Sequence, residues 1–227
     1  MAATNRRDGP LQKAAHDPVH DPGRDCPLCP RLVAFRNDTR RTQPDWHNAP
    51  VPAFGPLTAR LLIVGLAPGL RGANRTGRPF TGDYAGQLLY PTLLKFGLAR
   101  GTYLERPDDG LTMVDARISN AVRCVPPQNK PDVGEIKSCN SFLANEIAAM
   151  PNLKAILALG SIAHNAVLAA LSLKRAPYPF GHGALHPLSG GLTLGDSYHC
   201  SRLNTNTGRL TTAMFEDVVK TLKERSA

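Results

Sequence analysis

Four apolar stretches recur along the chain, each followed by a polar loop and an amphipathic segment. The first, residues 59–68 (ARLLIVGLAP), is apolar without a break, and this pattern is typical of a central strand buried on both faces. Three further strands are predicted at residues 112–124, 155–160 and 192–199. The pattern therefore predicts a sheet whose strands are separated by long connections.

The connections have the spacing of helices. Helices are predicted at residues 84–98, at 132–149 with Asp132 capping the first turn, and after a capping Ser161. A last helix presents apolar side chains at helical spacing, namely Met214, Phe215, Val218, Val219 and Leu222. Strand, loop and helix alternate about four times, which predicts an α/β fold: a parallel sheet of about four strands with helices on both faces.

The chain is expected to form one domain over residues 25–227. Residues 1–24 are polar, rich in His, Asp, Pro and Arg, and without periodicity, so they are predicted to be a flexible tail. Ligands of parallel sheets bind beyond the carboxyl ends of the strands. The three most unusual segments, residues 65–83, 120–131 and 196–209, all follow predicted strands, so we expect them to meet at one edge of the sheet.

The composition indicates the class of protein, and the net charge indicates a possible partner. Apolar residues make up 42% of the chain and charged residues 20%, which is typical of a globular protein, and no run approaches the ~20 apolar residues of a membrane span. The N-terminus has no apolar core of a secretory signal, so a cytoplasmic location is expected. The net charge of +9 is compatible with a polyanionic partner or simply with a basic protein, because the basic residues are scattered.

Five cysteines in such a chain favour metal binding or reactivity over disulfides. Cys26 and Cys29 form a Cys-x-x-Cys pair before a segment with helical spacing, and Cys124 and Cys139 lie further along. Four thiolates suit zinc or an iron–sulfur cluster, which composition cannot separate, and buried inert cysteines are the alternative. Cys200 is not obviously part of the set.

The loop at residues 65–83 is glycine-rich and polar, so its backbone can approach a ligand closely. It lacks both the Gly-Lys-Ser/Thr of a phosphate-binding loop and the Gly-x-Gly-x-x-Gly of a dinucleotide fold, which disfavours nucleotide hydrolysis and NAD chemistry. His199, at the end of the last predicted strand, could donate a hydrogen bond to developing negative charge, although a lone histidine is more often structural.

Several segments in order, CPLCPRLVAFR, RLLIVGLAPG, GANRTGRPFTGD, NAVRCVPPQNKP, PFGHGA and SYHCSRLNTNTGRLTTAMF, resemble the type-5 uracil-DNA glycosylases, an iron–sulfur branch of the uracil-DNA glycosylase superfamily. The resemblance covers nearly the whole chain after the tail, and NRTGRPFTGD together with NTNTGRLT is highly specific. It implies a three-layer α/β/α sandwich with a four-stranded parallel sheet, in agreement with the pattern above.

The resemblance also implies what individual residues do. It implies a structural 4Fe–4S cluster on Cys26, Cys29, Cys124 and Cys139. It assigns catalysis to Asp83 near the sugar, His199 as the donor to uracil O2, and Asn129. The flipped base would stack on Phe80 and meet the backbone around Ala67 and Gly69, and Asn120 matches the residue with which type-4 relatives read the uracil edge.

The implied partner is DNA containing uracil or other deaminated bases such as hypoxanthine, with no membrane and a monomeric enzyme. The loop after His199 resembles a segment that enters the minor groove, with Leu203 as the apolar wedge. Phosphate contacts are predicted for Arg75, Arg78, Arg202 and Arg209.

One departure from the other branches concerns the first motif. Leu66 and Ala67 replace an acid or Asn that activates water elsewhere, which moves that task to Asp83. Two alternatives to a glycosylase stay open at this point: a non-catalytic damaged-DNA binder that kept the pocket, and a zinc-thiolate nucleic-acid module. The presence of Asp83, Asn129 and His199 together argues against the pure binder.

Overall fold

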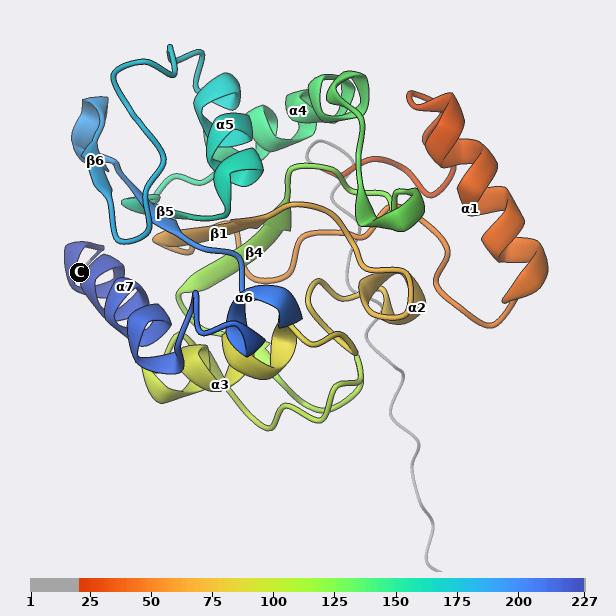
Figure 1. Ribbon diagram of the computed structural model, residues 1–227, viewed down its shortest axis with the longest axis horizontal. Helices are drawn as coiled ribbons and strands as arrows, with labels where there is room; N and C mark the ends of the chain where they lie inside the picture. Colours follow the sequence, from red (N-terminus) through yellow and green to blue (C-terminus); the bar gives the residue numbers. More distant parts are fainter. Residues whose placement is uncertain (1–20, 227) are drawn as a thin grey trace, which may run out of the picture.

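The structure is a computed structural model that describes residues 21–226. Its main sheet has four parallel strands and, beside the last of them, one short antiparallel strand (Figure 1). In spatial order the strands are β4 (Ala116–Asn120), β1 (Leu61–Gly65), β5 (Ala155–Leu159), β7 (Thr193–Ser197) and β6 (Leu185–Pro187). A small antiparallel pair, β2 (Ala99–Arg100) and β3 (Thr112–Met113), lies outside this sheet.

Helices cover both faces of the sheet. One face is packed against α3 (Gly86–Lys95) and α7 (Thr212–Arg225), and the other against α4 (Val133–Ala148) and α5 (Ser161–Ala170) (Figure 1). The remaining helices are α1 (Pro30–Thr42), α2 (Ala73–Thr76) and α6 (Arg202–Asn206). The three-layer α/β/α architecture and the four parallel strands predicted from the sequence are therefore confirmed.

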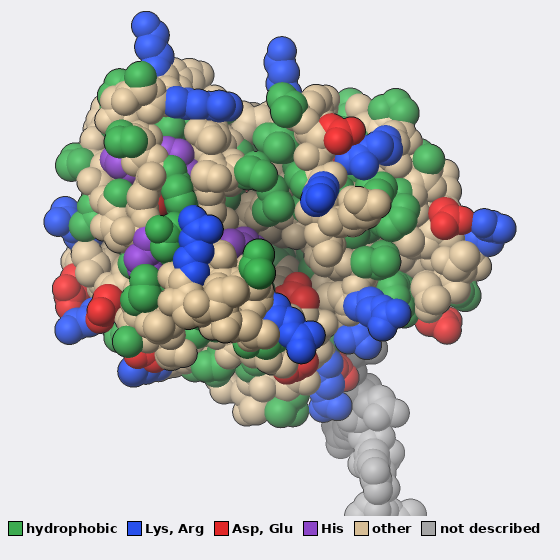
Figure 2. Space-filling model, viewed as in Figure 1, with side chains coloured by type: hydrophobic (Ala, Val, Ile, Leu, Met, Phe, Trp, Pro, Cys, Tyr) green, Lys and Arg blue, Asp and Glu red, His purple; other side chains and the backbone are tan. Residues whose placement is uncertain are grey.

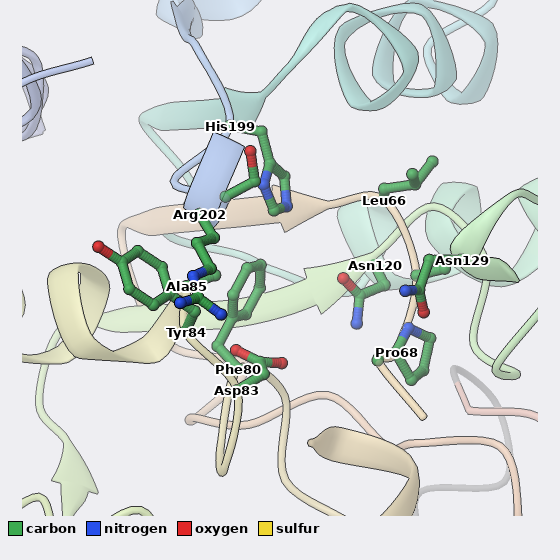
Figure 3. A pocket seen from close by; sticks show the side chains of 13 residues that line it. Leu66, Pro68, Phe80, Asp83, Tyr84, Ala85, Asn120, Asn129, His199 and Arg202 are labelled. Carbon is green, nitrogen blue, oxygen red and sulfur yellow. The ribbon is translucent and has the colours of Figure 1, made fainter. Parts of the chain in front are cut away.

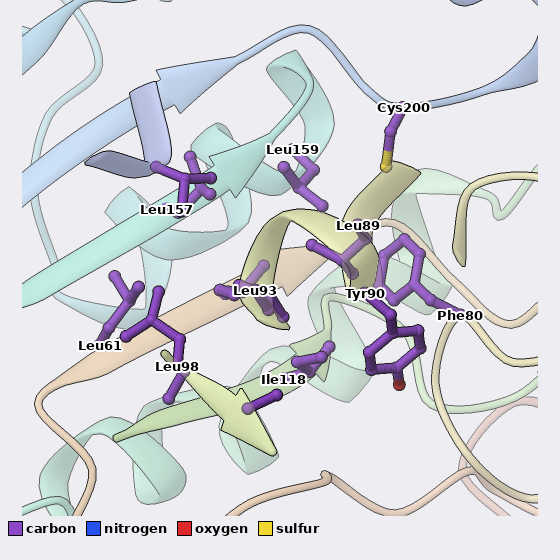
Figure 4. Packing of buried hydrophobic residues seen from close by; sticks show 14 of the residues in the cluster. Leu61, Phe80, Leu89, Tyr90, Leu93, Leu98, Ile118, Leu157, Leu159 and Cys200 are labelled. Carbon is purple, nitrogen blue, oxygen red and sulfur yellow. The ribbon is translucent and has the colours of Figure 1, made fainter. Parts of the chain in front are cut away.

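The two strands with apolar side chains on both faces, β1 and β5, lie inside the sheet, between β4 and β7. On β1, Leu61 and Ile63 enter the core under α3 and α7, whereas Leu62 and Val64 enter the core under α4 and α5, and all four are fully buried. Each such side chain contributes about 1.5–3 kcal/mol when it leaves water. Figure 4 shows the first of these cores, in which Leu89 and Leu93 of α3 pack against the strands.

The register of the strands fixes where the following loops begin. Gly65, the last residue of β1, lies beside Asn120, the last residue of β4, and Leu159 lies beside Ser197 in the pair of β5 and β7. Because these strands are parallel and end level with one another, the loops after β1, β4 and β7 start at the same edge.

Strand β6 was not predicted; it lies within residues 177–191, which are rich in His, Gly and Pro. This three-residue edge strand, Leu-His-Pro, is too short to show a pattern. The single strand predicted at 112–124 is in fact β3 and β4, separated by Val114 and Asp115. The helix after β5 is capped by Gly160, with a φ of +93°, rather than by Ser161, whereas Asp132 forms the expected cap with Glu135.

The predicted tail boundary at residue 24 is wrong at its inner end. Residues 1–20 lie outside the described residues, but Asp21 is buried and accepts a hydrogen bond from Arg123 at 2.8 Å. Arg123 also pairs with Glu146, which in turn pairs with Arg117. A buried ion-pair network therefore ties the chain to the domain from residue 21.

Within the described residues, no helix is long and apolar enough to cross a membrane.

Candidate active site

A cavity of about 460 Å³ lies at the edge where β1, β4 and β7 end (Figure 3). Eight of the predicted site residues line it: Ala67, Gly69, Phe80, Asp83, Asn120, Asn129, His199 and Arg202. Five further lining residues were not predicted: Leu66, Pro68, Tyr84, Ala85 and Ser201. The expected convergence of the three loops is therefore observed, while the role of each residue stays a prediction.

Phe80 lies in the wall of this cavity in an unusual conformation. Its φ is +53°, in the left-handed region that a bulky residue rarely adopts. Its ring lies over Gly65, where a Cβ would come within 2.5 Å of the ring atom Cζ, so the last position of β1 has to be glycine. The ring centroid is 6.0 Å from that of His199 (Figure 3). A flat ligand in the cavity would therefore meet an aromatic wall next to an imidazole.

Asp83 follows this segment and places its carboxylate against the backbone of Gly72. The Gly86 backbone N–H donates to its Oδ1 at 3.2 Å. Burial raises the pKa of Asp83, and the backbone hydrogen bonds from Gly86 and Ala85 oppose that rise without cancelling it. Within the described residues Asp83 forms no ion pair, so its negative charge is free to face the cavity.

His199 follows the end of β7, and its ring lies next to that of Phe80 in the cavity (Figure 3). The side-chain amide of Asn204 donates to the His199 backbone oxygen at 2.8 Å and fixes the chain there. Burial lowers the pKa of His199 to about 4. The imidazole is therefore neutral at physiological pH and has one N–H to donate.

Two amides lie together across the cavity from Tyr84 and Arg202 (Figure 3). Asn120 is buried at the end of β4, and its Oδ1 has no hydrogen-bond partner in the described part of the chain. Asn129 is exposed and has a φ of +57° in the turn after Pro127. A buried oxygen without a partner is costly, so Asn120 points to a ligand that brings an N–H.

Most of the predicted DNA contacts lie at the protein surface, and one of them, Arg202, also lines the cavity. Arg75, Arg202 and Arg209 are exposed, and Leu203, on α6, has 72% of its surface exposed. Figure 2 shows basic side chains on both sides of the hollowed part of this face. An exposed leucine in the first turn of a short helix, directly after Arg202, has the character expected of an apolar wedge.

The prediction that Arg78 contacts phosphate is wrong. Arg78 is 5% exposed, and both terminal nitrogens donate to the Asp109 carboxylate at 2.8 Å. Its Nε donates to Thr81 at 2.7 Å. The guanidinium is enclosed by the rings of Phe54, Tyr90 and Tyr103, so no surface remains for DNA.

The four cysteines predicted to bind a metal group come together from three segments. Cys26 and Cys29 precede α1, Cys124 follows β4, and Cys139 lies in α4, and all of them line one small cavity. Arg36 approaches Cys124 Sγ at 3.8 Å. Cys200 is fully buried in the core that also contains Phe80 (Figure 4), and it does not line this small cavity.

A second group of possible metal ligands, His164, His186 and Asp196, lies in another part of the molecule. His164 Nδ1 is 2.7 Å and His186 Nε2 is 3.2 Å from the Asp196 carboxylate. His164 Nε2 is 2.9 Å from the backbone oxygen of Tyr178. These hydrogen bonds attach the loop before β6 to β7, which accounts for the cluster without an ion.

Fold and pocket together define an α/β protein with a cavity at the carboxyl edge of its sheet, lined by an aromatic ring, a carboxylate and an imidazole. Residues 52–223 match the family described as the Uracil DNA glycosylase superfamily. Over 204 residues the chain is 46% identical to a type-5 uracil-DNA glycosylase of Thermus thermophilus (87% of this chain, 92% of the relative).

Two proteins of Pyrobaculum aerophilum allow the similarity to the type-5 and type-4 branches to be compared. A type-5 uracil-DNA glycosylase is 41% identical over 86% of each chain, and a type-4 uracil-DNA glycosylase is 32% identical over 66% of this chain and 63% of the relative. The chain belongs to the uracil-DNA glycosylase superfamily, and its similarity to the type-5 members covers more of its length.

Proposed function

We propose that this protein is a DNA glycosylase that removes uracil from DNA by hydrolysing the N-glycosidic bond, leaving an abasic site. One observation carries the proposal: a single cavity unites an aromatic ring, an unpaired carboxylate and a neutral imidazole, contributed by Phe80, Asp83 and His199. The superfamily membership and the type-5 relatives support the same activity.

Binding begins when the damaged nucleotide leaves the duplex and enters the cavity, which costs a few kcal/mol of stacking and pairing. Stacking on Phe80 returns about 1–3 kcal/mol. The unpartnered Oδ1 of Asn120 can accept from the N3–H of uracil, while its amide N–H donates to O4. Backbone groups around Ala67 and Gly69 line the remaining edge of the base.

In the reaction the C1′–N1 bond breaks and its electron pair leaves with the base. The neutral N–H of His199 donates to uracil O2, where negative charge accumulates. The carboxylate of Asp83 faces the sugar, which becomes positive, and can orient the attacking water with help from Asn129. Water adds its oxygen to C1′, and its proton ends on the departing uracil anion.

Other deaminated bases fit the same contacts. Hypoxanthine, like uracil, presents a carbonyl next to a ring N–H, and this is the edge that the amide of Asn120 can read. The broad substrate range therefore belongs to the proposal. We further propose that the enzyme acts as a monomer in the cytoplasm, with Arg75, Arg202 and Arg209 on phosphates and Leu203 filling the space the base leaves.

We also propose that Cys26, Cys29, Cys124 and Cys139 hold a 4Fe–4S cluster. In a tetrahedral zinc site, with Zn–S of about 2.3 Å, the sulfurs lie only about 3.8 Å apart. In the described chain no three of these four sulfurs all lie within 4.8 Å of one another, whereas a tetrahedral zinc site brings all four closer than that. A cluster, in which each thiolate binds a different iron, suits that spacing.

The charge near the cysteines supports an anionic occupant. Arg36 is 3% exposed, has no carboxylate partner in the described part of the chain, and leaves its Nε without a hydrogen bond. The Arg123 backbone N–H points at Cys139 Sγ at 3.3 Å. A thiolate-bound cluster would neutralise this buried cation, and it would link the start of α1 to α4 as a structural crosslink.

Excision is tested with a labelled oligonucleotide that contains one uracil, followed by alkali. Strand cleavage at that position is expected with the wild-type protein, and much slower cleavage with unchanged DNA affinity is expected for Asp83→Asn and for His199→Ala. Retention of the oligonucleotide without any abasic product would instead establish a damaged-DNA binder. Uracil, hypoxanthine and thymine opposite each base define the range.

The cluster has its own test, which does not depend on activity. The purified protein should be brown and contain about four iron and four sulfide per chain, since all four ligands are present. One zinc per colourless chain would overturn this part of the proposal and leave the excision result untouched.

A further inference from the structure

The segment from Arg78 to Asp83 carries two of the proposed site residues and is held in an unfavourable conformation. Phe80 adopts a φ of +53°, which persists only when the surrounding structure enforces it. Asp83 lies three residues further on in the same segment, so any relaxation of the backbone at Phe80 would move both side chains.

Two tyrosine hydroxyl groups hold consecutive carbonyl groups of this segment. Tyr103 donates to the Phe80 oxygen at 3.1 Å, and Tyr90 donates to the Pro79 oxygen at 2.6 Å. The two phenol rings lie with centroids 4.5 Å apart. Gly86 completes the arrangement, because a Cβ at that position would collide with the Phe80 oxygen and the Tyr103 hydroxyl.

Behind the tyrosines lies the buried pair of Arg78 and Asp109. The guanidinium is 5.5 Å from the Tyr90 ring centroid and 5.9 Å from that of Tyr103, and it fixes both rings from one side. Asp109 also accepts from the Leu104 backbone N–H at 2.9 Å, next to Tyr103 in the chain. The connection between β2 and β3 is thereby anchored at the point where Tyr103 reaches Phe80.

We propose that Tyr103, anchored by the Arg78–Asp109 pair, is a positioning residue for base excision. The hydroxyl keeps the Phe80 carbonyl in place, and this holds the Phe80 ring in the cavity wall and the Asp83 carboxylate toward the sugar. Tyr103 does not line the cavity, so it acts through these two residues rather than on the substrate. The proposal rests on the glycosylase function proposed above.

The test is Tyr103→Phe, which removes one hydroxyl and keeps the ring packed. The matched control is Thr92→Val: it removes a buried hydroxyl that donates to the Leu88 backbone oxygen at 2.8 Å in α3, in the same part of the molecule. Three quantities are compared: the single-turnover excision rate, the affinity for DNA with an uncleavable uracil analogue, and Tm. Tyr90→Phe is a second variant that removes the neighbouring hydrogen bond.

Tyr103→Phe should slow excision about five- to tenfold, the loss expected when one hydrogen bond no longer orients the reacting groups, with DNA affinity unchanged. Tyr90→Phe should act in the same direction, whereas Thr92→Val should lower only Tm. A wild-type rate in Tyr103→Phe, or an equal rate loss in Thr92→Val, would overturn the positioning role of Tyr103. Absence of excision by the wild-type protein would instead refute the proposed function.

Discussion

Replacing Arg78 by methionine separates the buried role of this residue from the phosphate contact that its sequence motif suggested. The substitution keeps an unbranched apolar side chain and removes the guanidinium group with its charge. Asp109, whose side chain is fully buried, would then lose both charged hydrogen bonds and retain only the backbone N–H groups of Leu104 and Leu111. Asp109 would then be a buried carboxylate without a positively charged partner, so we expect the substitution to lower the stability of the fold.

The magnitude follows from the burial and from the pKa of Asp109. Removing one partner of a buried pair costs about 3–5 kcal/mol, which corresponds to a fall in Tm of about 6–20 °C for a chain of this length. Burial alone would raise the pKa of Asp109, but the hydrogen bonds from Arg78, Leu104 and Leu111 outweigh it and hold the pKa at about 2. A carboxyl group whose pKa is lowered by folding from about 3.8 to about 2 contributes roughly 2.5 kcal/mol to the free energy of unfolding above pH 3.8. This contribution is lost as the pH falls toward 2.

Thermal unfolding and the salt dependence of DNA affinity are the two measurements, with Arg75→Met as the exposed control. Arg78→Met should lower Tm strongly and leave the slope of log affinity against log salt unchanged, whereas Arg75→Met should reduce that slope by about one and leave Tm alone. A wild-type Tm together with a reduced slope in Arg78→Met would show that Arg78 contacts phosphate rather than stabilising the fold.

Four further outcomes are expected. The excision rate should fall in acid at a pH above that of an ordinary aspartate, because burial raises the pKa of Asp83 and the carboxylate acts only when ionised; a flat profile down to pH 4 would contradict this. The imidazole of His199 should show no NMR titration between pH 6 and 8, since its pKa is about 4. Leu203→Ala should weaken affinity for uracil-containing duplex more than for single strands, where no space is left to fill; equal loss on both would oppose the wedge. Cys139→Ser should abolish the visible absorption of the cluster and lower Tm, whereas the buried Cys200→Ser should keep the absorption.

The fold could be predicted from the sequence because the decisive signals are local. The unbroken apolar run at 59–68 marks a strand covered on both sides, and three further runs separated by helical spacing force parallel connections. The edge strand β6 carries no such signal, since Leu185–Pro187 is short and contains a histidine and a proline. The short helices α2 and α6 escaped notice for the same reason, because four or five residues show no period.

The position of the candidate site was also predictable from the sequence, whereas the direction of individual side chains was not. Topology alone brings the loops after β1, β4 and β7 to one edge, so the meeting of Asp83, Asn120 and His199 was predictable without coordinates. The direction of an individual side chain was not. Arg78 lies in a polar loop, where residues are expected to be exposed. Its partner Asp109 lies 31 positions away in a polar stretch without periodicity. Only the packing of the Phe54, Tyr90 and Tyr103 rings around the guanidinium reveals that Arg78 points inward.

The charges in the cavity explain why one carboxylate is enough for the proposed reaction. Burial opposes ionisation of Asp83 and protonation of His199 alike, so the cavity favours neutral groups. Asp83 nevertheless forms no ion pair in the described residues, and the nearby Glu105 only raises its pKa further. Its negative charge therefore remains unneutralised until the sugar becomes positive, and a neutral His199 does not cancel it. The attraction is thus stronger in the transition state than in the bound substrate, which is the condition for accelerating bond cleavage.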